Sequence, residues 1–219
     1  MPRLLFEKTG NAVWISHLDL MRLFQRAFKR AGLPLKHSQG YNPRPLVAIA
    51  MPLSVGVESV CELLDFELEG CDIPNPEIKE RLNGTLVEGV RVRHVYDNAQ
   101  KIKNLAYLQS TVTLEYDKGI SPEDVQRIRD LFVQDSLCVE KKGKNGPTQQ
   151  DIIPLIKKLE VIQPDDNTAE LHALVCCQNP SLNPMLLMTA ISTYLPDLTA
   201  DHGSCKREEI YDINNHLFR

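Results

Sequence analysis

Residues 16–34 read SHLDLMRLFQRAFKRAGLP, and this stretch decides the fold of the first half of the chain. Ser16 can accept a hydrogen bond from a free amide of a first helical turn, and Asp19 three positions later suits the positive end of the helix dipole. Gly32 is typical of the position that follows a helix, and the proline two residues later prevents the helix from restarting. The pattern therefore predicts a helix over residues 17–31.

The predicted helix has two different faces. At 100° per residue its large apolar side chains gather on one side, which predicts that this side packs against the rest of a core. Four cations gather on the other side, where they repel one another at i, i+4 spacing. Acidic groups from elsewhere or a polyanion should therefore face them. The apolar side comprises Leu20, Phe24, Ala27, Phe28 and Ala31, and the cationic side comprises Arg22, Arg26, Lys29 and Arg30.

The elements around this helix follow an order that occurs twice. In the first half, residues 3–8 and 12–15 are predicted as short strands bent at Gly10-Asn11, which together count as the first strand; further strands are predicted at 46–50, 60–69 and 89–96, and a second helix at 75–83. In the second half, helices are predicted at 121–133 and 184–195, and strands at 107–116, 136–141, 168–177 and 206–212. Residues 155–162 fit either a strand or a helix. Each half reads β-α-β-β-α-β, with one extra element in the second half.

This order is that of the ferredoxin-like fold, in which two helices cover one face of an antiparallel sheet. The sequence therefore predicts an α+β protein of two tandem ferredoxin-like units. Residues 97–106, DNAQKIKNLA, are polar and lack a hydrophobic period, so they are predicted to join the units. The predicted domains are residues 1–98 and 105–219. Residue similarity between the halves is weak, so the duplication rests on the order of elements alone.

Composition excludes several classes of protein. The chain has 219 residues, of which 42% are hydrophobic and 25% charged, as in ordinary globular proteins. No apolar run approaches the ~18 residues of a membrane span, and the N-terminus lacks a secretory leader, so a cytoplasmic protein is expected. The six cysteines form no C-x-x-C pair and no C-x-x-x-C-x-x-C triplet, so no iron–sulfur cluster of the radical SAM kind is predicted. His17, Asp19 and His37 do not match a standard ligand spacing, so no metal site is predicted, and no cofactor is expected.

Positive charge is concentrated near the N-terminus. Residues 1–60 hold eight Lys and Arg and three acids, although the whole chain has a net charge of −4. Between Asp19 and Glu58 there is no acid, whereas six cations and His37 lie there. A basic segment in an acidic chain favours a local anionic partner. The alternative is a basic helix face that the acidic remainder of the chain neutralises.

A loop completes the candidate site. Residues 35–45, LKHSQGYNPRP, are predicted to form turns, and Gly40 permits a backbone conformation that other residues avoid. The helix, this loop and a second loop at 52–59 are predicted to form one anion- or RNA-binding surface. Arginines can bind phosphate bidentately, and Tyr41, with Trp14 if exposed, can stack on a base. The predicted binding residues are Arg22, Arg26, Lys29, Arg30, Arg44, Tyr41, Asn42, Ser38 and Ser59.

Two stretches resemble a known family. Residues 15–45, ISHLDLMRLFQRAFKRAGLPLKHSQGYNPRP, and residues 51–68, MPLSVGVESVCELLDFEL, occur in the order and at the spacing of motifs in the radical SAM-linked family, a domain of unknown function. The chain departs from that pattern at Trp14 and Tyr41, where Phe is usual, and at His37, where Tyr is usual. The matching positions are Ser16, His17, Asp19, Arg22, Arg30, Ser38, Gly40, Asn42, Pro43, Pro45, Gly56, Ser59, Glu62 and Asp65.

The resemblance implies a partner rather than a reaction. Members of the family look like companions of a B12-binding-type radical SAM protein, encoded beside it or fused to it, and their activity is not established. Together with the charge pattern, this favours a non-catalytic accessory protein that binds RNA or a substrate, in RNA modification or processing.

Two other hypotheses stay open on the sequence alone. The first is a metal-independent endoribonuclease of the CRISPR RNA-processing type, in which His17 and His37 serve as general base and general acid. The second is a protein that binds a small anionic ligand in a pocket holding Arg44, His17 and Ser59. A structural reading also exists, because helix capping explains Ser16 and Asp19 fully, and His17 has the position of an ordinary hydrogen-bonded histidine.

Overall fold

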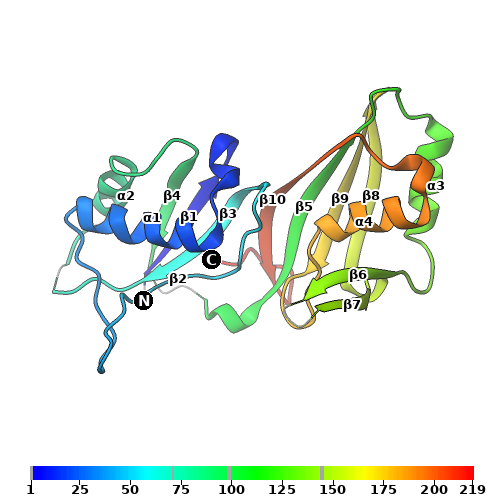
Figure 1. Ribbon diagram of the computed structural model, residues 1–219. Helices are drawn as coiled ribbons and strands as arrows, with labels where there is room; N and C mark the ends of the chain where they lie inside the picture. Colours follow the sequence, from blue (N-terminus) through cyan, green and yellow to red (C-terminus); the bar gives the residue numbers. More distant parts are fainter. Residues whose placement is uncertain (1, 71, 98–99, 144–145) are drawn as a thin grey trace. The chain divides into compact units, whose positions relative to one another are not determined.

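The chain divides into two compact units, which Figure 1 shows by element. Unit 1 comprises residues 1–104 together with Arg219, and unit 2 comprises residues 105–218. Residues 98–99 of the predicted connecting segment lie outside the part of the chain that the structure describes. The computed structural model describes residues 2–70, 72–97, 100–143 and 146–219.

Unit 1 contains an antiparallel sheet and two α-helices. Its strands lie in the order β4-β1-β3-β2, so the first strand is flanked by the third and fourth. The elements are β1 (Arg3–Lys8), η1 (Gly10–Trp14), α1 (His17–Arg30), β2 (Val47–Ile49), β3 (Val57–Phe66), α2 (Asn75–Asn83), β4 (Val90–Tyr96) and η2 (Ile102–Asn104).

Helix α1 begins and ends close to the predicted residues because its signals are local. The Ser16 hydroxyl accepts a hydrogen bond from the Asp19 amide at 3.2 Å, which caps the first turn. Gly32, after the last turn, has a φ of +67°, which L side chains rarely adopt. The predicted apolar side is buried, with the exception of the half-buried Ala31 at the helix end.

The core of unit 1 lies between the two helices and one face of the sheet. Phe6 of β1 meets Phe24 of α1 edge to face, with ring centroids 4.7 Å apart, and Phe28 lies 5.1 Å from Phe66 of β3. All four rings are fully enclosed. Buried side chains of α2 and β4 belong to the same core, so both helices cover the same face of this sheet.

Unit 2 repeats this arrangement and adds a hairpin. Its sheet has the order β10-β5-β9-β8, and all neighbouring strands are antiparallel. Strands β6 and β7 follow α3 and precede β8 in the chain, and among the described strands they pair only with each other. Figure 1 shows α3 and α4 on one side of the sheet. The elements are β5 (Leu105–Glu115), α3 (Pro122–Leu131), β6 (Cys138–Gly143), β7 (Gly146–Asp151), η3 (Ile153–Leu155), β8 (Ile156–Asp165), β9 (Thr168–Cys176), α4 (Met185–Tyr194), η4 (Pro196–Leu198) and β10 (His202–Asp212).

The α+β class and the antiparallel pairing are confirmed in both units, whereas two local predictions need correction and one open assignment is resolved. Residues 12–15 are not a strand, because residues 10–14 form a 3₁₀ turn that leads into α1. The strand predicted at 136–141 does not join the unit 2 sheet and forms the β6–β7 hairpin instead. The ambiguous segment at 155–162 is strand β8, which pairs with β9.

Replacement of Phe24 by Ala tests the core of unit 1. Because the ring is fully buried against Phe6, the variant should lose about 3–5 kcal/mol of unfolding free energy. Urea denaturation followed by circular dichroism measures the loss. Arg26→Ala, on the exposed face of the same helix, is the matched control and should stay within about 0.5 kcal/mol of the original protein. Equal stability of the two variants would contradict this account of the core.

Gly89 provides a second test, at the turn before β4. Its φ is +82°, and a Cβ there would overlap the Thr9 carbonyl oxygen and lie 2.8 Å from the Ala12 Cβ. Gly89→Ala should therefore lower the unfolding free energy by about 1–3 kcal/mol. Gly84→Ala is the control, because Gly84 has a φ of −70° and a Cβ there would keep 3.6 Å from its neighbours. The same urea titration should show no loss of stability for Gly84→Ala.

Candidate nucleic-acid interface

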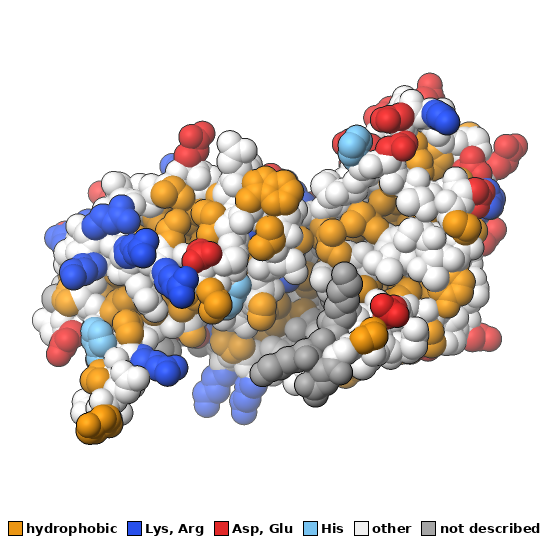
Figure 2. Space-filling view, in the orientation of Figure 1, with side chains coloured by type: hydrophobic (Ala, Val, Ile, Leu, Met, Phe, Trp, Pro, Cys, Tyr) orange, Lys and Arg blue, Asp and Glu red, His pale blue; other side chains and the backbone are white. Residues whose placement is uncertain are grey.

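The cationic side of α1 faces solvent. Arg22, Arg26, Lys29 and Arg30 are all exposed, because the helix buries its opposite side in the core of unit 1. Figure 2 shows Lys and Arg side chains gathered along this helix. The geometry follows from the 100° rotation per residue, which separates the two kinds of side chain onto opposite sides.

Most of these cations form no side-chain hydrogen bond or ion pair in the described part of the chain. The exception is Arg22, whose Nη1 donates to Asp19 Oδ1 at 3.0 Å; both side chains are more than half exposed, so water screens this pair. Hydrogen bonds from Ser16 and then Arg22 lower the pKa of Asp19, so its carboxylate stays charged. No described carboxylate pairs with the other three α1 cations. The alternative of a helix face neutralised by acidic residues from elsewhere has no support among the described ion pairs, in which Arg22–Asp19 is the pair that involves α1.

Residues 36–46 form a hairpin-like projection between α1 and β2, which we call the finger (Figure 1). Its two sides are joined by backbone hydrogen bonds from Leu46 to Lys36 at 2.7 Å and from Ser38 to Arg44 at 2.8 Å. The Ser38 hydroxyl also accepts from the Arg44 amide at 3.0 Å. These bonds give Ser38 a structural role in closing the finger.

The end of the finger presents an aromatic ring to solvent. Gly40 has a φ of +132°, which permits the reversal of the chain at this point. Tyr41 and Asn42 follow it, and the Tyr41 side chain is fully exposed. The Arg44 side chain is also exposed and has no hydrogen bond or ion pair within the described residues. Buried aromatic side chains stabilise a fold, whereas this one contributes nothing to a core.

Two open pockets flank the base of the finger. The first has a volume of about 510 Å³ and lies between the C-terminal part of α1, which contributes Gln25 and Lys29, and the finger, which contributes His37 and Pro45. The second, of about 470 Å³, is lined by His37 and by Lys36 through Gly40 on the finger. Glu69 lines both. The finger and the cationic helix are therefore parts of one continuous surface.

His17 is not brought to His37. His17 is the first residue of α1, whereas His37 lines a pocket with Lys29, twelve residues further along the helix. At 1.5 Å rise per residue, His17 and Lys29 are roughly 18 Å apart along the axis. The His17 Nδ1 atom is enclosed and has no hydrogen-bond partner among the described residues. A general acid and a general base must reach the same reacting group, and these two histidines do not.

The prediction for Ser59 needs correction. Ser59 lies in β3, opposite Lys8 of β1, and its side chain is fully buried. Its hydroxyl accepts from the Cys61 amide at 3.3 Å, so it is part of the interior and does not reach a ligand at the surface. The described residues also contain no group of three or more His, Cys, Asp or Glu side chains placed to hold a metal ion.

Sequence reasoning missed one polar surface in unit 2. Gln109 of β5, His172 of β9 and Tyr211 of β10 line a pocket of about 360 Å³ on the face of the sheet that the helices leave uncovered. The alternation of buried and polar residues in β9 marks which side chains share a face. The alternation does not reveal which strands lie beside one another. The pairing of β5 with both β9 and β10 is what brings the three residues together.

None of the helices in the described part of the chain is long and apolar enough to cross a membrane.

Comparisons with known proteins give a fold likeness and a family. A chain in the crystal structure of a Cbf5-Nop10-Gar1 complex is similar with a TM-score of 0.50 at 10% identity, over 95% of this chain and 48% of that one. A chain of an archaeal box H/ACA sRNP Nop10-Cbf5 complex gives 0.46 at 8% identity, over 94% and 46%. This chain therefore spans about half the length of these two chains, and identities this low concern the fold alone.

The search of curated proteins finds no significant match. The sequence model of a family described as uncharacterized protein conserved in bacteria, DUF2344, matches residues 2–184. Because the match extends over most of the sequence, the chain belongs to the DUF2344 family.

Proposed function

We propose that the protein binds single-stranded RNA as a non-catalytic accessory protein, through the cationic side of α1 and the finger. The observation that carries this proposal is a set of exposed cations whose side chains form no hydrogen bond or ion pair among the described residues, together with the fully exposed ring of Tyr41. These cations are Arg26, Lys29, Arg30 and Arg44.

Electrostatics favour a polyanion at this surface. Unit 1 has fifteen Lys and Arg against twelve Asp and Glu, a formal charge of +3, although the chain as a whole carries −4. Arg22, Arg26 and Arg30 follow one another at i, i+4 spacing and repel. Phosphates would relieve that repulsion and release condensed counterions, which is the main source of affinity in nucleic-acid binding.

The aromatic groups favour a single strand over a duplex. Tyr41 lies at the end of the finger, whose base lines a pocket with the C-terminal part of α1, and Trp14, which precedes the helix, is 70% exposed. Unpaired bases can stack on such rings, whereas the bases of a duplex are already stacked on one another.

The pocket of about 510 Å³ beside the finger has the size of a small-ligand site and presents Gln25 and His37 as polar groups.

The strand orders support a more detailed proposal for the fold. In each unit the first strand lies between the third and the fourth, and the second strand lies beyond the third, if the β6–β7 hairpin is counted as an insertion. We propose on this basis that the units are two ferredoxin-like domains, at residues 1–98 and 105–219.

The proposed partner is a radical SAM protein. Its support is the resemblance of residues 15–45 and 51–68 to the radical SAM-linked family, and copurification from native cells tests it. The endoribonuclease alternative is less well supported, because His17 begins α1 whereas His37 lies beside the C-terminal part of that helix. The small-anion alternative is also less well supported, because Ser59 is buried. RNA binding without cleavage is therefore the function that the surface of unit 1 supports best.

Removal of two α1 cations tests the interface. Arg26→Ala/Lys29→Ala should weaken binding of a single-stranded RNA of about twelve nucleotides at least tenfold, measured by fluorescence anisotropy. The slope of log affinity against log salt should fall by about 0.7 for each phosphate that the variant no longer neutralises. Lys118→Ala, an exposed cation of unit 2, is the control and should bind like the original protein. Affinity that does not change between about 50 and 200 mM salt would refute an interface made by cations.

Tyr41 distinguishes a single-strand reader from a general basic surface. Because the ring is fully exposed, Tyr41→Ala should leave the unfolding transition unchanged. It should weaken single-stranded RNA binding by about 1–3 kcal/mol, the range for loss of one stacked base. Tyr41→Phe keeps the ring and should retain binding. Loss of binding to a duplex of the same sequence to the same extent would show that stacking is not the role of Tyr41.

A further inference from the structure

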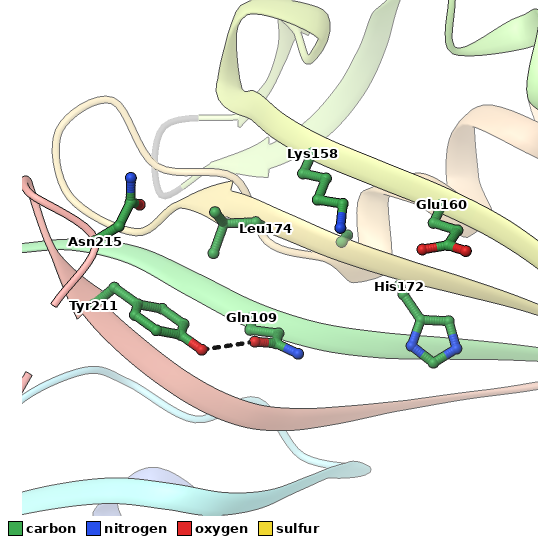
Figure 3. Close-up of a pocket in the computed structure, with 8 residues that line it drawn as sticks. Gln109, Lys158, Glu160, His172, Leu174, Tyr211 and Asn215 are labelled. Atoms are coloured by element: carbon green, nitrogen blue, oxygen red, sulfur yellow. Dashed lines mark hydrogen bonds between the residues drawn. The ribbon is translucent and has the colours of Figure 1, made fainter. Parts of the chain in front are cut away.

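Unit 2 has a pocket on the face of its sheet that α3 and α4 do not cover. In β9, buried residues alternate with Glu170, His172 and Leu174, so these three share the uncovered face, and Gln109 and Thr111 of β5 pair in register with Leu174 and His172 on that face. The pocket has a volume of about 360 Å³, and the side chains that line it come from β5, β8, β9 and β10 (Figure 3). This is near the lower end of the range for small-molecule sites.

The floor of the pocket is fixed by hydrogen bonds between strands. The Tyr211 hydroxyl donates to Gln109 Oε1 at 2.9 Å, drawn as a dashed line in Figure 3, and Gln109 Nε2 donates to Glu208 Oε2 at 3.3 Å. The Thr111 hydroxyl donates to the other oxygen of Glu208 at 2.9 Å. Four side chains from β5 and β10 are thereby held in one orientation, which lowers the entropy lost when a ligand binds.

His172 is held in the same way. Its Nε2 lies 2.9 Å from Glu170 Oε2, and its Nδ1 lies 3.4 Å from the Thr111 hydroxyl. Both ring nitrogens are therefore engaged by protein groups. His172 therefore forms a fixed part of the pocket wall. The polar groups that can bind a ligand must come from other residues.

Strand β8 supplies two such groups, of opposite charge. Lys158 and Glu160 are two residues apart, so they share a face of the strand, and they pair in register with Leu174 and His172 of β9. Figure 3 shows both side chains on the pocket side. In this view Leu174 of β9 lies between Lys158 and Tyr211. Neither Lys158 nor Glu160 has a hydrogen bond or an ion pair within the described residues.

The charge around the pocket selects the ligand. Among the described residues that line the pocket, Glu160 supplies one carboxylate and Lys158 one ammonium, whereas Glu170 and Glu208 lie outside the lining and are already engaged by protein side chains. Unit 2 as a whole has ten Lys and Arg against seventeen Asp and Glu, a formal charge of −7. A polyanion is repelled by such a surface, and a simple anion would meet only one cation. A molecule that carries both an amine and a carboxylate can pair with Glu160 and Lys158 at once.

We propose that this pocket binds a small zwitterionic amine of the free amino-acid class. The carboxylate of the ligand pairs with Lys158, its ammonium group pairs with Glu160, and its side chain lies against Leu174 and the ring of Tyr211. This site is separate from the cationic side of α1, and it does not depend on the proposal that unit 1 binds RNA.

Calorimetry with the full chain tests the site. Each of the twenty standard L-amino acids is titrated, and at least one should bind. For the tightest of them, the N-acetyl derivative, which lacks the ammonium group, and the carboxamide, which lacks the carboxylate, should each bind at least about tenfold more weakly. No binding by any of the twenty would overturn the proposal.

Variants of the two charged residues assign the contacts. Lys158→Gln should weaken the amino acid about tenfold and leave the carboxamide unchanged, and Glu160→Gln should weaken the amino acid and leave the N-acetyl derivative unchanged. Lys157→Gln is the matched control, because its side chain bonds to the Pro154 carbonyl and does not line the pocket. Equal binding by all three variants would overturn the assignment. RNA affinity should be unchanged in all three, so the two proposals fail or succeed separately.

Discussion

The packing of α1 against β1 and β3 is the constraint on which the candidate interface depends. Phe24 and Phe28 must lie on the sheet side to meet Phe6 and Phe66, and their burial fixes the rotation of the helix about its axis. With that rotation fixed, every residue about 180° away faces solvent. The exposure of Arg22, Arg26, Lys29 and Arg30 is therefore a consequence of the core. The same packing places the finger, which follows α1, beside Lys29.

Local sequence signals were sufficient to predict α1, whereas the pairing between strands that are distant in the sequence was not predictable. Ser16, Asp19 and Gly32 act within one or two turns, so the sequence predicted the helix within one residue. The burial of Ser59 results from the pairing of β3 with β1, more than fifty residues away, and no local pattern reports it. The β6–β7 hairpin was missed for a related reason, since a strand that pairs only with its neighbour has the same alternation as one in the main sheet.

The candidate site was predicted in part for the same physical reason. The cations of α1 lie together because they share a helix, and Tyr41 is exposed because it follows Gly40 at a reversal of the chain. Whether His17 and His37 come together depends on where the finger lies along α1, and the sequence does not contain that information. The polar pocket of unit 2 requires the lateral order of four strands, so it was also out of reach. The two units share a strand order, yet their formal charges have opposite signs, which is in line with the rule that function resides in side chains placed on a fold.

The construction of the finger has a consequence for the thermodynamics of recognition. Pro43 and Pro45 each fix a φ angle, and the Ser38–Arg44 hydrogen bonds close the loop beneath them. A loop with these restraints populates fewer conformers before it meets a ligand than a flexible one of the same length. The entropy of ordering is therefore lost largely during folding, and the aromatic ring at the end of the finger is presented in a nearly rigid frame.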